Sequence, residues 1–109
     1  MQTGLCLRFY LSESDEVDGQ PAIEGVLRLC QQAGLHALSV LRGIEGLGKH
    51  GVHSTSFLSL AHSLPIVVEA VASEAVIEHA LSILRPKLPT ATMMTWPVQM
   101  ISPTLTSHP

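Results

Sequence analysis

LCLRFYLS, residues 5–12, is the segment that decides the fold, because Leu or Phe stands at every second position. A period of two is typical of a β-strand that buries one of its faces. Working outward, the chain predicts three further strands, at Ala37–Arg42, Ile66–Val71 and Thr90–Ile101. Pro65 precedes the third strand at a position where proline is tolerated, and Pro97 makes the last one an edge strand or a bulged strand.

Two helices are predicted between these strands. Pro21 opens the first, where its missing N–H is no loss, and Gly34 ends it. Ser73 is a good N-cap for the second, Glu74 favours the positive end of the helix dipole, and Pro86 ends it. The stripes expected to face the sheet are Ile23, Val26, Leu27, Cys30 and Ala33 in the first helix, and Ile77, Ala80, Leu81 and Leu84 in the second.

The resulting order is strand, helix, strand, strand, helix, strand, with the polar run Ser12–Gly19 as a loop. This order predicts an α+β, ferredoxin-like βαββαβ domain, in which a four-stranded antiparallel sheet carries both helices on one face. Residues 1–101 form this single domain, and the Ser/Thr/Pro-rich segment 102–109 is expected to be a disordered tail. The strands are apolar on both sides, so a second copy of the chain is expected to cover the open face.

The overall composition excludes several classes of protein. The 109 residues are 46% apolar and 14% charged, unlike a disordered chain, and the net charge of −3 offers no electropositive surface for nucleic acid. No window approaches the about 20 apolar residues of a membrane span, and Met1–Tyr10 lacks the basic start of a signal peptide. Cys6 and Cys30 are expected to be buried, reduced thiols. We therefore expect a cytoplasmic protein that is not embedded in a membrane.

The most suggestive segment chemically is GIEGLGKHG, residues 43–51, which has four glycines in nine positions. Backbone N–H groups in such a segment can form a concavity for an anion, with Arg42 at its entrance and Lys49 as an added charge. The alternative is a flexible connection whose glycines merely permit a turn. No Gly-Lys-Ser/Thr follows, so this is not a P-loop.

The remaining candidate residues give weaker evidence for a functional site. His50, His53 and His62 lie close together in the sequence, but convergent ligands of other types are scarce and no metal site is predicted. Glu69, in an apolar strand, needs a cationic partner, for which Arg42 and Arg8 are the candidates, and that pairing is expected to be structural. No serine stands in a nucleophile motif, so we do not expect an enzyme.

Three segments together carry a family resemblance: VLRGIEGLG at residues 40–48, VHS at 52–54 and LPIVVE at 64–69. They resemble the DUF190 family of the PII-like superfamily, although Ser54 stands where that family usually has threonine. The resemblance implies a ferredoxin-like subunit, a compact trimer, and a protruding loop between the second and third strands. In PII proteins this loop responds to a nucleotide held in the cleft between subunits and then docks on a transporter or an enzyme.

Two functional hypotheses follow from the residues and the resemblance. The first is a regulatory homotrimer that binds a small anionic effector, with an adenine nucleotide expected, at the subunit cleft. Its site would consist of Arg42, the backbone of Gly43, Gly46 and Gly48, and Lys49, with His53 and Glu69 at its flanks. The second is a non-catalytic trimeric scaffold that binds no small molecule.

Overall fold

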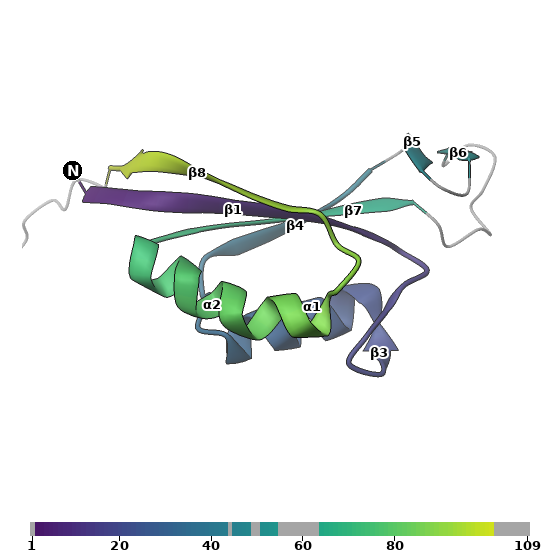
Figure 1. The fold of residues 1–109 in the computed structure, drawn as a ribbon. Helices are drawn as coiled ribbons and strands as arrows, with labels where there is room; N and C mark the ends of the chain where they lie inside the picture. The colour runs from purple at the N-terminus through teal and green to yellow at the C-terminus, as the bar shows by residue number, and fades with distance from the viewer. Residues whose placement is uncertain (1, 44, 49–50, 55–63, 102–109) are drawn as a thin grey trace, which may run out of the picture.

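Residues 2–43, 45–48, 51–54 and 64–101 are described by the computed structural model. Its principal strands are β1 (Gln2–Ser12), β4 (Leu38–Arg42), β7 (Pro65–Ala72) and β8 (Met93–Met100), and its helices are α1 (Ala22–Gln32) and α2 (Glu74–Lys87). The strands form one four-stranded sheet in the order β4-β7-β1-β8, with every neighbouring pair antiparallel. Both helices cover the same face of this sheet (Figure 1). The predicted ferredoxin-like α+β fold is confirmed.

The alternation in β1 builds the core. Leu7 and Phe9 are 0% and 1% exposed and lie directly opposite Ala70 and Val68 of β7. Opposed residues in an antiparallel pair point to the same face, so these four side chains line the helix-covered side of the sheet. The intervening residues of β1, such as Arg8, point to the open side.

Helix α1 begins at Ala22, directly after Pro21, and the glycine that follows it, Gly34, has a φ of 89° as a helix stop requires. Its buried face differs from the predicted stripe. Leu27 is 43% exposed, whereas Leu29 is 2% exposed and packs in the core. The observed buried positions, Ala22, Val26, Leu29, Cys30 and Ala33, follow the helical period more closely, and Leu27 lies on the solvent side of that stripe.

Helix α2 has the predicted N-cap, because the Ser73 hydroxyl oxygen accepts a 3.3 Å hydrogen bond from the backbone N–H of Val76. Ile77, Ala80 and Leu84 are buried as expected, and Leu81 is partly buried. Pro86 does not end this helix, which runs on to Lys87. A proline in the last turn removes one backbone donor and leaves the rest of the helix intact, so the helix tolerates it.

The run predicted as a loop, Ser12–Gly19, instead contains most of a small hairpin. Strands β2 (Glu16–Val17) and β3 (Gln20–Pro21) pair across Asp18-Gly19, whose φ angles of 55° and 77° fit a tight two-residue turn. Val17 is 1% exposed, so the hairpin contributes to the core. An ion pair of 2.9 Å between Lys87 Nζ and Asp18 Oδ1 joins the hairpin to the end of α2.

The glycine-rich segment begins a second, separate pair of strands. The backbones of β5 (Glu45–Gly48) and β6 (Gly51–Ser54) pair antiparallel, with Gly46 opposite His53 and Gly48 opposite Gly51. Figure 1 places this ribbon beyond the ends of β4 and β7. The mobility and ligand-dependent ordering expected of residues 43–51 stay predictions, since residues 44, 49 and 50 lie outside the described residues. The expected tail at 102–109 lies outside them too.

Candidate functional site

The root of the β5–β6 ribbon is fastened to the sheet at Gly43. Its backbone N–H donates a 2.7 Å hydrogen bond to the carbonyl oxygen of Pro65, the first residue of β7. A Cβ atom at position 43 would lie 2.6 Å from the Pro65 ring, so a glycine is required for this close approach. Arg42 is the last residue of β4 and therefore lies beside the root. The predicted entrance to the glycine-rich segment thus lies at the end of β4, beside the first residue of β7.

The predicted residues of the segment itself are located by backbone alone. Gly46 and Gly48 belong to β5, and His53 belongs to β6 opposite Gly46. Lys49 lies outside the described residues. The structure therefore brings Arg42, Gly43 and the ribbon backbone to one end of the sheet.

Arg42 is already neutralised by a carboxylate for which the sequence gives no signal, that of Glu13. Nη2 of Arg42 lies 2.7 Å from Oε2 and 3.0 Å from Oε1 of Glu13. The Glu13 side chain is only 15% exposed, and its backbone N–H donates a 2.8 Å hydrogen bond to the carbonyl oxygen of Leu64. The Arg42 side chain is 55% exposed, and one nitrogen makes both contacts. Among the residues that the structure describes, no other partner binds the remaining guanidinium donors of Arg42.

Glu69 has a different partner from Arg42. Of the two candidates, Arg8 is the one that binds it: Arg8 Nε donates a 2.9 Å hydrogen bond to Glu69 Oε2, and the two residues are directly opposite in the β1–β7 register. This hydrogen bond is the main reason why the pKa of Arg8 is raised. Arg42 lies opposite Ile66 and so belongs to the other face of the sheet. Within one chain, Glu69 therefore does not flank Arg42.

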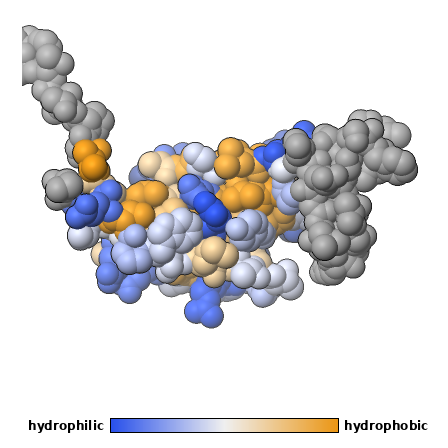
Figure 2. Space-filling view, turned by 90° about the horizontal axis from the view of Figure 1, so that it is seen from above, coloured by the Kyte–Doolittle hydropathy of each residue, from blue (hydrophilic) through white to orange (hydrophobic). Residues whose placement is uncertain are grey.

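The open face of the sheet is apolar around this ion pair. The Arg8 guanidinium carbon lies 5.1 Å from the centre of the Trp96 ring, which is a cation–π geometry. Tyr10, Leu41 and Met94 are 39%, 58% and 40% exposed. Figure 2 looks down on this face, where hydrophobic patches flank a hydrophilic strip. The prediction that the strands are apolar on both sides is correct for this face.

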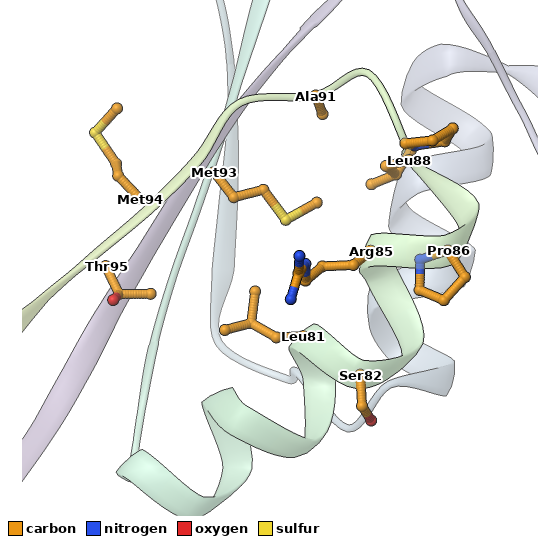
Figure 3. A pocket seen from close by; sticks show the side chains of 10 residues that line it. Leu81, Ser82, Arg85, Pro86, Leu88, Ala91, Met93, Met94 and Thr95 are labelled. Atoms are coloured by element: carbon orange, nitrogen blue, oxygen red, sulfur yellow. The ribbon is translucent and has the colours of Figure 1, made fainter.

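A groove of about 830 Å³ lies between α2 and β8. Arg85 of α2 extends into it between Leu81 and Met93 (Figure 3). Arg85 makes no ion pair with any side chain that the structure describes, in contrast to Arg42 and Arg8. The sequence gives no signal for Arg85, because one arginine on a helix forms no motif.

Two negative findings apply to the described part of the chain. Neither α1 nor α2 has both the length and the apolar character needed to cross a bilayer. No three His, Cys, Asp or Glu side chains of the described residues gather into a group that could hold a metal ion.

Residues 4–100 match the model of the family DUF190, described as "Uncharacterized ACR". The chain belongs to the DUF190 family. A UPF0166 protein of Methanocaldococcus jannaschii is 30% identical over 82 residues, which cover 75% of this chain and 72% of the relative. A UPF0166 protein of Aquifex aeolicus is 32% identical over 82 residues, covering 74% and 78% respectively.

Solved structures show the same fold. CPII from Thiomonas intermedia, a nitrogen regulatory PII-like protein bound to ADP, AMP and bicarbonate, superposes with a TM-score of 0.67 at 16% identity, covering 90% of this chain and 88% of CPII. A putative PII-like signalling protein from Thermus thermophilus gives a TM-score of 0.53 at 19% identity, covering 90% and 89%. This DUF190 protein therefore has the PII-like variant of the ferredoxin-like fold.

Proposed function

We propose that this DUF190 protein is a regulatory homotrimer that binds an adenine nucleotide in the cleft between subunits. The observation that carries the proposal is the position of Arg42. This permanently charged side chain stands at the root of a glycine-rich ribbon, on a fold that binds ADP and AMP in CPII. The ribbon signals the bound state to a partner, a transporter or an enzyme, in the cytoplasm, where adenine nucleotides are available.

The effector site uses the residues selected from the sequence. Arg42 and Lys49 supply positive charge, and the backbone N–H groups of Gly43, Gly46 and Gly48 supply neutral donors. His53 flanks the site from β6. Glu69 lies on the open face of the sheet, away from Arg42 of the same chain. The Glu69 that flanks Arg42 in the cleft therefore belongs to a neighbouring copy.

The Glu13 carboxylate competes with an anionic effector for the Arg42 guanidinium. An anionic effector that binds Arg42 replaces part of the contact with the Glu13 carboxylate, which is the ligand that Arg42 holds in the isolated chain. Exchange of one carboxylate for a phosphate conserves the charge-assisted hydrogen bonds of the guanidinium. The exchange also releases the side chain of Glu13, the residue that follows β1. Because the Glu13 backbone is hydrogen-bonded to Leu64, and the neighbouring Pro65 is hydrogen-bonded to Gly43, occupancy of the site is linked to the backbone at the root of the ribbon.

A thermal-shift titration with AMP, ADP, ATP, cyclic nucleotides and bicarbonate tests the proposal. A ligand at one hundred times its Kd stabilises the native state by about 2.7 kcal/mol, which raises the melting temperature measurably. A rise with one or more adenine nucleotides supports the regulatory function. If no compound changes the melting temperature, the effector proposal is wrong. The alternative, a non-catalytic scaffold, then replaces it. That alternative agrees with an Arg42 whose charge is already neutralised by Glu13.

A further inference from the structure

The groove between α2 and β8 exists because two helices do not cover a four-stranded sheet completely. Helix α2 packs mainly against β1 and β7, and β8 extends past it as the edge strand of the sheet. Met93 and Thr95 of β8 lie opposite Phe9 and Leu7, whose side chains are on the helix-covered side, so all four residues face that side. The helix-covered side of β8 is therefore one wall of the groove, and α2 is the other (Figure 3).

The lining of this α2–β8 groove is mostly apolar. Leu81, Ala91 and Met93 are only partly buried at the margin of the core, so they keep apolar surface in the groove. The hydroxyl of Ser82 already has an acceptor, because it donates a 2.6 Å hydrogen bond to the backbone carbonyl oxygen of His79. A hydrocarbon group in the groove would remove apolar surface of both walls from water, which is favourable in proportion to the area covered.

Arg85 is the only charged residue among those that the structure shows lining the groove. Figure 3 places its guanidinium between Leu81 and Met93, over the preceding turn of the helix, which is the usual direction of a long helical side chain. The positive charge thus lies away from the C-terminal, negative end of the dipole of α2. A guanidinium that stands between apolar side chains is complementary to an anion that carries an apolar group next to its charge.

The charge and the length of the groove restrict the class of anion. A nucleoside polyphosphate or a polyanion carries several negative charges and would meet a single cation here. The lining runs along the helix axis from Leu81 to Leu88, about 10 Å at about 1.5 Å per residue, which favours a short hydrocarbon chain over a long lipid tail. The groove is also separate from Arg42 of the same chain, because β4 and β8 are opposite edges of the sheet.

We propose that the α2–β8 groove binds a medium-chain monocarboxylate. The carboxylate binds the Arg85 guanidinium, and the hydrocarbon chain packs between Leu81 of α2 and Met93 of β8. This ligand is a second one, of a different chemical class from the nucleotide, and its site shares no residue with the effector site proposed around Arg42. The inference therefore does not depend on the proposed function.

A titration of the full chain with octanoate, followed by NMR of the backbone amides without nucleotide, tests this site. Saturable chemical-shift changes are expected in the second half of α2 and at the start of β8. Acetate, which lacks the chain, and 1-octanol, which lacks the charge, are expected to bind much more weakly at the same positions. Arg85→Gln removes the charge and is expected to weaken octanoate binding by about tenfold. Arg28→Gln, which removes an exposed arginine from α1, is the matched control, with no change expected.

Three results would each overturn the proposal. They are equal affinities of wild type and Arg85→Gln, equal affinities for octanoate and 1-octanol, and shift changes centred on Tyr10 and Leu41 of the open sheet face. If circular dichroism shows that Arg85→Gln does not fold, the comparison of octanoate with 1-octanol on the wild type decides alone. A failed nucleotide screen with octanoate binding intact would remove the effector proposal alone, and the reverse pattern would remove this one alone.

Discussion

Arg42 is the residue on which the proposed effector site depends most. A charge-assisted hydrogen bond contributes about 1.5–3 kcal/mol, so Arg42→Ala is expected to weaken nucleotide binding by about tenfold or more without dissolving the assembly. Lys49→Ala is expected to weaken it less, because a lysine ammonium acts as a single point charge, whereas the arginine guanidinium can bind a phosphate with two donors. Isothermal titration calorimetry on both variants measures the two effects. Wild-type affinity in Arg42→Ala would show that the site lies elsewhere.

Glu13 is expected to oppose the effector at the same arginine. Glu13→Gln keeps the size of the side chain and removes the charge that neutralises Arg42 at 2.7 Å, so an anionic nucleotide meets a freer guanidinium. We expect its Kd to fall several-fold, measured by the same calorimetry. Glu16→Gln, which removes an exposed carboxylate from the nearby hairpin, controls for the change in net charge. An equal gain in both variants would assign the effect to long-range charge instead of to Glu13.

The partners of the ion pairs could not be predicted from the sequence. The sequence correctly indicated that Glu69 needs a cationic partner, but the choice of Arg8 over Arg42 depends on the register between β1 and β7. Arg8 and Glu69 are 61 positions apart, and Arg42 and Glu13 are 29 positions apart. No local pattern encodes contacts over such separations, so Glu13 could not be selected from the sequence.

At the scale of the element, the β2–β3 hairpin depends on Gly25 of α1. A Cβ atom at this position would overlap the carbonyl oxygen of Val17, which is backbone and cannot rotate away. Gly25→Ala is therefore expected to destabilise the fold by about 1–3 kcal/mol through overpacking, although alanine favours a helix. Urea unfolding measures the change, with Gln31→Ala on the exposed side of the same helix as the control. Stability equal to or above the wild type would mean that the hairpin does not pack here.

The elements were predictable where one local rule dominated. Period-two alternation located β1, and a serine before an apolar helical stripe located the start of α2. Errors arose where two rules competed. Leu27 and Leu29 are equally apolar, and only packing against the sheet decides which of them is buried. Charge made Ser12–Gly19 resemble a loop, although Asp18-Gly19 is a hairpin signal that lies within it.

At the scale of the whole molecule, the sheet order follows from the alternation of strands and helices, but the partner surface does not. Six elements in the order βαββαβ admit few arrangements, and the antiparallel order β4-β7-β1-β8 is the expected one. The proposed effector site at a subunit cleft, by contrast, would depend on how copies meet, and no sequence period describes the shape and charge of the open face.

The open face leads to the last prediction, a homotrimer. Leu41, Tyr10, Met94 and Val71 are 58%, 39%, 40% and 36% exposed on one side of a single sheet, and exposed apolar patches of this kind mark association surfaces. Multi-angle light scattering at micromolar concentration is expected to give three times the chain mass of 11.7 kDa. A dimer would keep the argument from apolar burial but contradict the trimer that the PII-like resemblance implies. A stable monomer would contradict both, because the face would then remain in water and the cleft that holds the effector would not exist.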